Sequence, residues 1–538
     1  MMKYGRQKPH KGVKFLTSRK RIAAFYIGML IGLVIIFTNL TPLRQFQAAI
    51  GAVFLAPQAG PNPAPAVIPS LHEWHGDHGF FMLGSGSRIT LDPAYTAQLQ
   101  STAQVFQSDL SSVIGHALPI VTTSSPAGGD FFLTLNNADS SIGNEGYLFQ
   151  VSDTVVISAH TTTGVFYGTR TALQILLQDP SKTYIPRGIA RDYPQYTERG
   201  FMLDAGRKFF SLSTLEDYVK FMAWYKMDDF HIHFNDNVPG GGDSTDWMHQ
   251  YAAFRLNSPR FPGLAAADGS YTQQDILALE AVASKYHVTI TPEIDMPAHD
   301  LAFTQYRPDL ASPNFSKEFL DLSNPNTYTF LNSIWTTFIP WFDSKQVDIG
   351  ADEYSPTDAD RYRQFINTYD TFLRSKGKTV RMWGSLTKMQ SSVQVNPNIV
   401  IDDWDNAWSN PVAMANADFS IINANDDLLY IVPRAGYFHD YLDTQLLYNQ
   451  WEPDIFSLTD PTLNLQPGNP LLLGGMFSEW NDKLGSVVSD ADVYSRVQPA
   501  MQTLSQKLWS ATTAGIPYEQ FMQIAQRVST APGTHLPE

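Results

Sequence analysis

The sequence predicts an α/β protein whose main body is a (β/α)8 TIM barrel, preceded by a small α+β domain and an N-terminal transmembrane helix. Buried strands alternate with helical stretches from residue 199 onward, and eight such strands fall within roughly 280 residues, which is the count of this barrel. The strands are 199–204, 229–234, 288–295, 346–350, 379–384, 398–404, 419–424 and 471–477. Helical patterns such as 213–226 and 273–286 separate most of them. A doubly wound open sheet is the alternative, but no glycine-rich nucleotide loop follows any strand.

Length and charge limit the class of protein. A chain of 538 residues with 43% hydrophobic content can form two or three domains with large cores. The net charge is −15, and the first 21 residues hold eight Lys and Arg and no acid, so the remainder is more acidic still. An acidic body without a basic stripe argues against a nucleic-acid partner. The absence of cysteine excludes disulfides, thiolate metal sites and a cysteine nucleophile.

The N-terminus predicts a membrane anchor. Residues 1–21 are basic and are expected in the cytoplasm, and 22–40 form an apolar run without charge, long enough to span a bilayer. We expect a single-pass protein of the cell membrane with its catalytic domain outside. A cleaved signal peptide is the alternative, with a cleavage site among the small residues at 48–52, and the protein would then be secreted. Residues 41–70, rich in Pro and Ala, are predicted to form an extended linker.

Two domains are expected after the linker. In 71–195, short β-like runs alternate with helical patterns at 94–115 and 164–178, which indicates an α+β domain. We interpret it as a non-catalytic packing domain. The (β/α)8 catalytic domain is expected over 196–530.

Polar and aromatic residues follow nearly every predicted barrel strand. They are Asp204, Asp236, Glu293, Asp295, Asp352, Glu353, Trp383, Asp402, Trp404 and Glu479. In a barrel the carboxyl ends of the strands converge on the face that carries active sites. The sequence therefore predicts an acidic, aromatic-lined cleft.

The adjacent acids Asp352 and Glu353 in "VDIGADEYS" (347–355) allow three interpretations. They could cap the following helix, since acids are favourable in a first turn. They could bind a metal, but no motif holds His231, His233 and His299 at ligand spacing. They could belong to a glycosidase, although neighbouring positions can hardly flank a bond as the usual two carboxylates do, so one of them would handle a group on the substrate itself.

Aromatic residues at or just beyond strand ends favour the carbohydrate interpretation. They are Trp383, Trp404, Trp408, Tyr430, Tyr437 and Trp480. Sugars stack their C–H faces on such rings, and a barrel core would rather hold aliphatic side chains there.

Six motifs resemble the family 20 glycoside hydrolases, the β-N-acetylhexosaminidases. They are "RGFMLDAGRKF" (199–209), "YKMDDFHIHFND" (225–236), "TPEIDMPAHDLA" (291–302), "DIGADEYS" (348–355), "RMWGS" (381–385) and "GGMFSEW" (474–480). The resemblance covers roughly residues 66–530, and 146–176 is similar to the family's non-catalytic domain. It implies a retaining, substrate-assisted mechanism in which the 2-acetamido oxygen of the sugar attacks its own anomeric carbon and forms an oxazolinium.

The resemblance also implies roles for single residues. Asp352 would orient the acetamido group, and Glu353 would be the general acid that later activates water, with its pKa raised by Asp352. Asp295 and His299 would form a relay that supports Glu353. The residues expected to bind substrate are Arg199 on the ring hydroxyls, His233 and Asp236 on the floor, Trp383 and Trp404 on the acetamido walls, Tyr430 on the acetamido oxygen, and Glu479 and Trp480. The substrate is an oligosaccharide or glycoconjugate containing an amino sugar, and no metal or organic cofactor is expected.

Departures from the family pattern keep three functions open. The usual "PGH" is "PAH" (297–299), a glycine-rich loop follows Asp236 (235–243), and Val432 and Phe477 stand where an Asp and a Trp are common. The pattern "LLYIVPRAGYF" (428–438) is similar to the lacto-N-biosidase branch, which releases a disaccharide. The open functions are a β-N-acetylhexosaminidase, a lacto-N-biosidase, and an inactive membrane-tethered carbohydrate-binding protein.

Overall fold

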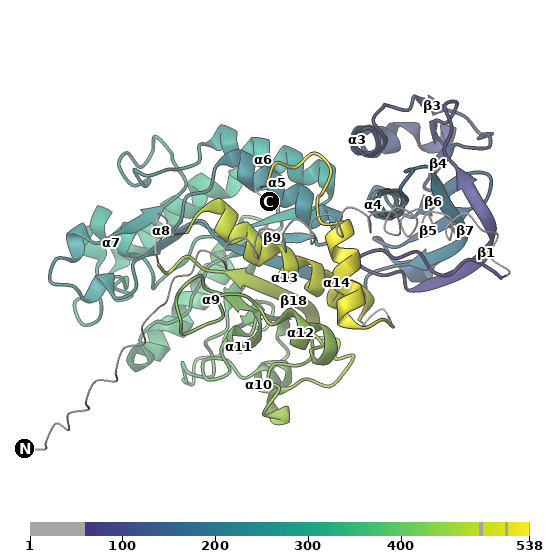
Figure 1. Ribbon diagram of the computed structural model, residues 1–538. Coiled ribbons are helices and arrows are strands. Elements are labelled where there is room, and N and C mark those ends of the chain that lie inside the picture. The colour runs from purple at the N-terminus through teal and green to yellow at the C-terminus, as the bar shows by residue number, and fades with distance from the viewer. Residues whose placement is uncertain (1–59, 484–487, 512–514, 537–538) are drawn as a thin grey trace, which may run out of the picture. The chain divides into compact units, whose positions relative to one another are not determined.

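The computed structural model describes residues 60–483, 488–511 and 515–536 (Figure 1). The predicted cytoplasmic segment (1–21), the predicted anchor (22–40) and residues 41–59 of the predicted linker lie outside the described residues. Among the residues that are described, no helix is long and apolar enough to cross a membrane. The membrane attachment therefore stays a prediction.

Eight parallel strands close into a barrel, which confirms the predicted fold class. Each strand pairs with the next along the chain, and pairing of the last strand with the first closes the ring. The strands are β8 (Glu198–Asp204), β9 (Asp229–His233), β12 (Thr289–Glu293), β13 (Gln346–Asp348), β14 (Thr379–Trp383), β15 (Val400–Asp403), β16 (Ser420–Asn423) and β18 (Leu472–Glu479). β9 is buried along its whole length, as expected for a strand covered on both faces, and its polar residues Asp229, His231 and His233 pair with Arg381, Glu293 and Asp236.

Three shorter strands lie outside the ring. They are β10 (Asn235–Asn237) and β11 (Ala252–Phe254), which pair with each other, and β17 (Tyr430–Ile431), which pairs with β18. β10 directly follows the barrel strand β9, and β17 directly follows a short helix (Asp426–Leu429) that comes after β16. Both strands therefore carry residues to the carboxyl-terminal face of the barrel.

Helices cover the outside of the barrel (Figure 1). They are α5 (Leu212–Trp224), α6 (Gln273–Tyr286), α7 (Leu301–Tyr306), α8 (Pro325–Phe338), α9 (Ala359–Ser375), α10 (Pro411–Asn416), α11 (Asp426–Leu429), α12 (Thr444–Gln450), α13 (Asp490–Ser510) and α14 (Tyr518–Arg527). Local sequence sets several of their starts: Thr272 with Asp275, and Ser489 with Asp492, form capping boxes that satisfy the first N–H groups of α6 and α13.

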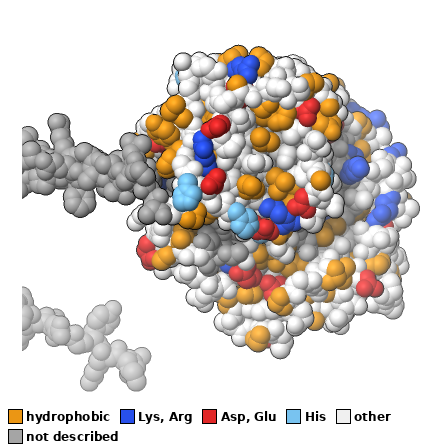
Figure 2. Space-filling view, turned by 90° about the vertical axis from the view of Figure 1, so that its right-hand side faces the viewer, with side chains coloured by type: hydrophobic (Ala, Val, Ile, Leu, Met, Phe, Trp, Pro, Cys, Tyr) orange, Lys and Arg blue, Asp and Glu red, His pale blue; other side chains and the backbone are white. Residues whose placement is uncertain are grey.

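A seven-stranded mixed sheet with two helices on one face forms the small domain. The strand order is β1-β7-β5-β6-β4-β2-β3, and the strands are β1 (Glu73–Met82), β2 (Ile89–Leu91), β3 (Ile120–Thr122), β4 (Phe131–Thr134), β5 (Tyr147–Val151), β6 (Val155–Ala159) and β7 (Tyr184–Asp192). The helices α3 (Thr96–Ile114) and α4 (Thr162–Gln178) match the predicted helical patterns. Figure 2 looks onto the side where β1 and β7 lie in Figure 1, and its Lys and Arg side chains stand among acidic and hydrophobic ones rather than in a basic stripe.

The end of the predicted linker is part of the fold, which corrects the prediction over 60–70. Val67 and Ile68 are buried. The side chain of Gln174 on α4 accepts a hydrogen bond from Ile68 N at 2.8 Å and donates one to Ile68 O at 2.7 Å. Pro and Ala are compatible with an extended path, but the apolar "AVIP" within it supplies side chains that are stabilised by burial.

Candidate active site

A cavity of about 400 Å³ lies at the carboxyl-terminal ends of the barrel strands. The residues predicted for the site that line it are His233, Asp236, Asp295, His299, Asp352, Glu353, Trp404, Tyr430 and Trp480. They come from segments far apart in sequence, and the barrel topology alone brings them together.

The loop after β13 places Asp352 and Glu353 side by side at this cavity. The backbone of Gly350, Ala351 and Glu353 has positive φ, a region that non-glycine residues rarely adopt and that occurs most often at functional sites. A Cβ on Gly350 would lie 1.8 Å from Asp295 Oδ1, so glycine allows this close approach. Ala351 N donates a hydrogen bond to the same carboxyl oxygen at 3.2 Å.

His299 lies between the acid pair and a third carboxylate. Its Nε2 is 3.4 Å from Glu353 Oε2 and 3.6 Å from Asp352 Oδ2, and its Nδ1 is 3.1 Å from Asp236 Oδ1. Burial disfavours the charged imidazole, but the carboxylates of Asp236 and Asp352 outweigh burial and raise the pKa of His299 well above its usual value. His299 is therefore an imidazolium at neutral pH.

Asp236, rather than Asp295, is the partner of His299, which corrects the predicted relay. Asp236 also accepts a hydrogen bond from His233 Nε2 at 2.8 Å and pairs with Arg207 Nη2 at 2.8 Å. Burial opposes its charge, yet Arg207 and His299 hold the pKa of Asp236 well below its usual range. Burial and then the charge of Asp352 raise the pKa of Asp295 well above its usual value.

The acid pair has unequal pKa shifts. Burial, followed by the charge of Glu353, raises the pKa of Asp352 to about 6. A hydrogen bond with His299, the largest influence, lowers the pKa of Glu353, which is opposite to the shift expected from the sequence. Asp352 Oδ1 is buried and has no hydrogen-bond partner among the described residues, so it can accept a bond from an N–H group that enters the cavity.

Four aromatic rings form one wall. Trp383, Trp404, Tyr430 and Trp480 lie with neighbouring ring centroids 5.6 to 6.3 Å apart. Trp404 Nε1 donates to Gly384 O at 3.0 Å, which fixes the ring. Trp383 is 1% exposed and lies behind Tyr430 and Trp480, so it supports the wall from the core side.

Arg199 is not in the cavity, which corrects the prediction that it holds ring hydroxyls. It is the second residue of β8 and so lies at the amino-terminal end of the barrel. Its buried guanidinium pairs with Glu145 at 2.7 Å and with Asp228 at 2.8 Å. Because Glu145 belongs to the small domain, Arg199 is an interface residue.

Glu479 is also outside the cavity lining. It is buried at the end of β18, where its Oε2 accepts a hydrogen bond from Asn481 Nδ2 at 2.9 Å, and burial raises its pKa well above the usual value. Phe477, two residues earlier, stacks on Phe201 with ring centroids 4.7 Å apart in the shell between strand and helices. The aromatic ring that this segment contributes to the cavity is Trp480.

Sequence reasoning missed several lining residues because they lie in the segments that follow the ends of the barrel strands. They are Arg207, Asn237, Glu318, Asp405, Asp426, Phe438 and Asp482. Arg207 is the most informative: it pairs with Asp204 at 3.1 Å, Asp236 at 2.8 Å and Asp482 at 3.4 Å. The signal was present, since Arg207 is the second arginine of "RGFMLDAGRKF" and follows β8 by three residues.

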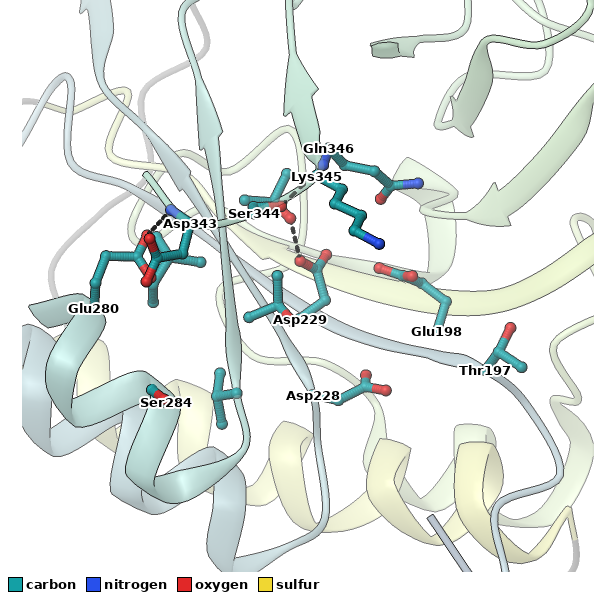
Figure 3. A pocket seen from close by; sticks show the side chains of 14 residues that line it. Thr197, Glu198, Asp228, Asp229, Glu280, Ser284, Asp343, Ser344, Lys345 and Gln346 are labelled. Carbon is teal, nitrogen blue, oxygen red and sulfur yellow. Dashed lines mark hydrogen bonds between the residues drawn. The ribbon is translucent and has the colours of Figure 1, made fainter. Parts of the chain in front are cut away.

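A larger cavity of about 510 Å³ lies at the opposite end of the barrel (Figure 3). Its lining combines the acids Glu198, Asp228, Asp229 and Glu280 with Lys345, and it contains no aromatic ring. The amino-terminal face of such barrels serves stability, so we assign the chemistry to the smaller cavity.

Within the described residues, three groups of His and acidic side chains have donor atoms close enough to hold a cation: His231, Glu293 and Asp348; His233, Glu293 and Asp295; and Asp295, His299 and Asp352. In the first two, the imidazole nitrogens already face Glu293 at 2.8 Å. In the third, the imidazole of His299 already faces a carboxylate on each side, Asp236 at 3.1 Å and Glu353 at 3.4 Å. We therefore assign these groups to hydrogen bonding.

Comparisons with known proteins agree with this geometry. The model of the glycosyl hydrolase family 20 catalytic domain matches residues 196–512, and that of the family's domain 2 matches residues 64–193. A lacto-N-biosidase of Bifidobacterium bifidum is 25% identical over 519 residues, which cover 91% of this chain and 43% of that protein. The β-hexosaminidase subunit A2 of Dictyostelium discoideum is 27% identical over 69% of each chain. This chain thus spans less than half the length of the lacto-N-biosidase.

Solved structures show the same fold. A mutant β-hexosaminidase of Streptomyces plicatus in complex with the product GlcNAc aligns with a TM-score of 0.70 at 20% identity, over 88% of this chain and 95% of that one. An exo-β-N-acetylglucosaminidase of Vibrio harveyi in complex with N-acetylglucosamine aligns with a TM-score of 0.70 at 19% identity, over 87% of this chain and 78% of that one.

Proposed function

This chain belongs to glycosyl hydrolase family 20, and from that premise we propose that it hydrolyses β-linked N-acetylhexosamine residues with retention at the anomeric carbon, as a β-N-acetylhexosaminidase. One observation carries the proposal: Asp352 and Glu353 lie side by side at the cavity, and His299 connects them to the buried carboxylate of Asp236. Adjacent acids cannot stand on opposite sides of a glycosidic bond, so they suit a reaction in which the substrate provides the nucleophile.

In the first step the acetamido oxygen attacks C1 and the bond from C1 to the leaving oxygen breaks. Glu353 gives its proton to the leaving oxygen and becomes a carboxylate. The positive charge passes to the oxazolinium ring, whose N–H donates to the unpaired Oδ1 of Asp352. Asp352 must be ionised to stabilise this charge.

In the second step a water molecule attacks C1. The Glu353 carboxylate takes the proton of that water, the bond between C1 and the acetamido oxygen breaks, and the neutral acetamido group returns. Glu353 ends protonated, as it began, and the β-configured hemiacetal leaves. The imidazolium of His299, held by Asp236, stabilises the Glu353 carboxylate between the two steps.

We assign the binding of ring hydroxyls to Arg207 and Asp482 instead of Arg199 and Glu479. Arg207 presents a charged planar donor group to the cavity. Asp482 presents a carboxylate acceptor, which also accepts a hydrogen bond from the Tyr437 hydroxyl at 2.7 Å. Trp480 supplies the apolar face beside them, with the Arg207 guanidinium 5.7 Å from its ring centroid.

The test is release of the aryl group by the full-length protein from the aryl β-glycosides of GlcNAc, GalNAc and lacto-N-biose. We expect cleavage of a monosaccharide glycoside, and a loss of about 10²–10⁴-fold in kcat for Glu353→Gln. Glu280→Gln, which alters a buried acid at the far end of the barrel, is the matched control and should retain activity. Wild-type rates in Glu353→Gln, or equal losses in both variants, would contradict the proposal.

Lacto-N-biosidase activity is the second candidate. The relative of that name aligns with 91% of this chain, and the rim beyond the acid pair carries Asp405, Asp426 and the 55% exposed Tyr437, which can contact a second sugar. Release from the lacto-N-biose glycoside with no release from the GlcNAc and GalNAc glycosides would establish this function in place of the first. Tight glycan binding without any release would instead indicate a carbohydrate-binding protein.

A further inference from the structure

A chain of buried contacts runs from the aromatic wall to Glu353. Its links are Trp383 Nε1 to Glu293 Oε1 at 2.8 Å, Glu293 Oε2 to His233 Nδ1 at 2.8 Å, His233 Nε2 to Asp236 Oδ2 at 2.8 Å, Asp236 Oδ1 to His299 Nδ1 at 3.1 Å, and His299 Nε2 to Glu353 Oε2 at 3.4 Å. The links from His233 onward line the cavity, whereas Glu293 and Trp383 are not part of its lining.

Glu293 is the branch point of this chain. It ends β12, and its side chain is fully buried. Trp383 Nε1 donates a hydrogen bond to Oε1 and His231 Nε2 hydrogen-bonds to Oε2, each at 2.8 Å, and His233 Nδ1 lies 2.8 Å from Oε2 as an ion-pair contact. Burial opposes its charge, but His233 and His231 outweigh burial and keep the pKa of Glu293 well below its usual range.

We propose that Glu293 is a positioning residue that holds the Trp383 wall and the His233–Asp236–His299 chain in register, and thereby fixes where the acetamido group and the Glu353 proton meet. This inference rests on the proposed function for its kinetic consequence, but its structural content stands on the contacts above. Glu293 does not reach the cavity, so it acts through Trp383 and His233.

A carboxamide cannot replace this carboxylate. Trp383 Nε1 faces one oxygen of Glu293, and the two histidine nitrogens face the other. Gln has one acceptor oxygen and an NH2 group, so Glu293→Gln must turn the NH2 group toward either the Trp383 N–H or the histidines. Loss of the contact with Trp383 should let its ring move within the acetamido wall and raise KM. Loss of the contact with His233 should let Asp236 and His299 move away from Glu353 and lower kcat. We expect kcat/KM to fall by about 10- to 100-fold.

The matched control is Asp348→Asn. Asp348 is equally buried on the neighbouring strand β13, where it approaches His231 at 4.0 Å and Arg381 at 3.8 Å, and among the described residues it makes no hydrogen bond or ion pair with Trp383 or His233. If Glu293 acts by position, Asp348→Asn keeps kcat/KM within a few-fold of wild type. An equal loss in both variants, in proportion to a lowered melting temperature, would reduce Glu293 to a structural role and overturn the proposal.

A readout independent of turnover uses the Trp383 indole. In full-length protein labelled with ¹⁵N-tryptophan, Trp383→Phe identifies the indole N–H resonance of Trp383. Glu293→Gln should move this resonance upfield, because its acceptor loses charge, and Asp348→Asn should not. Glu293→Asp keeps the charge but shortens the reach, so it should recover part of kcat and leave KM raised. An unmoved resonance, or full activity of Glu293→Gln, contradicts the proposal.

A double-mutant cycle decides whether Glu293 acts through the wall. Trp383→Phe removes the indole N–H and keeps a smaller aromatic ring at this position, so the part of its KM effect that comes from the lost N–H should overlap with that of Glu293→Gln, and the two effects should sum to less than additive. If Glu293→Gln fails to fold, Trp383→Phe alone must still raise KM, and an unchanged KM counts against the proposal. If wild-type protein cleaves no amino-sugar glycoside, the proposed function fails, while the resonance shift still tests the role of Glu293.

Discussion

At the scale of single residues, the surroundings of Asp352 and Glu353 decide their different roles. Both are carboxylic acids at adjacent positions, but Asp352 is nearly buried, whereas the side chain of Glu353 is 48% exposed and contacts His299. Burial raises the pKa of Asp352 to about 6, and the His299 hydrogen bond lowers that of Glu353. The two acids titrate as a pair, and the active form of the pair carries one proton.

This pairing predicts a pH dependence. The last proton leaves the pair near pH 6, so above that pH no proton is available for the leaving group, and kcat/KM should decline as the pH rises through about 6. Measurement of kcat/KM between pH 4 and 8 with a poor and an activated aryl leaving group checks this. The activated leaving group needs little protonation, so its decline should be shallower. Identical declines for both substrates would contradict the assignment of the proton to acid catalysis.

Substitutions at the two arginines of "RGFMLDAGRKF" should have opposite effects, one on activity and the other on stability. Arg207→Lys keeps a positive charge beside Asp236 but loses the planar donor group in the cavity, so kcat/KM should fall by about 10- to 100-fold with little change in thermal stability. Arg199→Ala leaves Asp228 unpaired at the domain interface and should lower the free energy of unfolding by about 3 kcal/mol. Chemical unfolding and steady-state kinetics of both variants separate these effects. A kinetic defect in Arg199→Ala at a temperature where it is fully folded would reverse the assignment.

At the scale of elements, the strands were predictable and the loops were not. All eight barrel strands were predicted from short runs of strand length in which buried apolar residues predominate, as expected for strands covered on both faces. Loop paths depend on contacts distant in sequence. The relay shows this: Asp295 is closer to His299 in sequence than Asp236 is, but the turn into β10 brings Asp236 to His299. Arg199 was misassigned because a residue that starts a strand and one that follows its end face opposite ends of a barrel.

Helix α6 carries a prediction on stability. Burial raises the pKa of Glu280 from its ordinary 4.5 to about 7, and its Oε1 accepts a hydrogen bond from Asp343 N at 3.2 Å (Figure 3). A carboxyl whose folded pKa is raised favours folding less as the pH rises, so its cost begins above pH 4.5 and is complete above about pH 7. Gln keeps the acceptor without the charge.

We therefore expect Glu280→Gln to be more stable than wild type at pH 8, by on the order of 1–3 kcal/mol, and equal to it at pH 4. Chemical unfolding at both pH values measures the difference. Glu519→Gln, at an exposed position of α14, is the control and should change little at either pH. A difference that is the same at pH 4 and pH 8 would show that the charge of Glu280 is not its cause.

At the scale of the whole molecule, the small domain and the barrel share buried charges. Lys226 Nζ lies 2.8 Å from Asp192 Oδ2, and Trp509 Nε1 donates to the other oxygen of Asp192 at 3.0 Å. With Arg199 and Glu145, these contacts tie the amino-terminal end of the barrel to the sheet and leave its carboxyl-terminal end for the cavity. The sequence predicted both domains but not this interface. Taken one at a time in the sequence, the charged residues that form it look like ordinary surface charges.

The central claim is that the substrate's own acetamido group is the nucleophile in the cavity that Asp352 and Glu353 build. It is tested most directly by kcat/KM for aryl β-glycosides of GlcNAc whose N-acetyl group carries zero, one, two or three fluorine atoms. Fluorine withdraws electrons from the carbonyl oxygen, so the account predicts a steep and continuous fall across the series in the wild-type protein. A rate independent of fluorination would mean that a group of the protein attacks the anomeric carbon, and it would contradict the account.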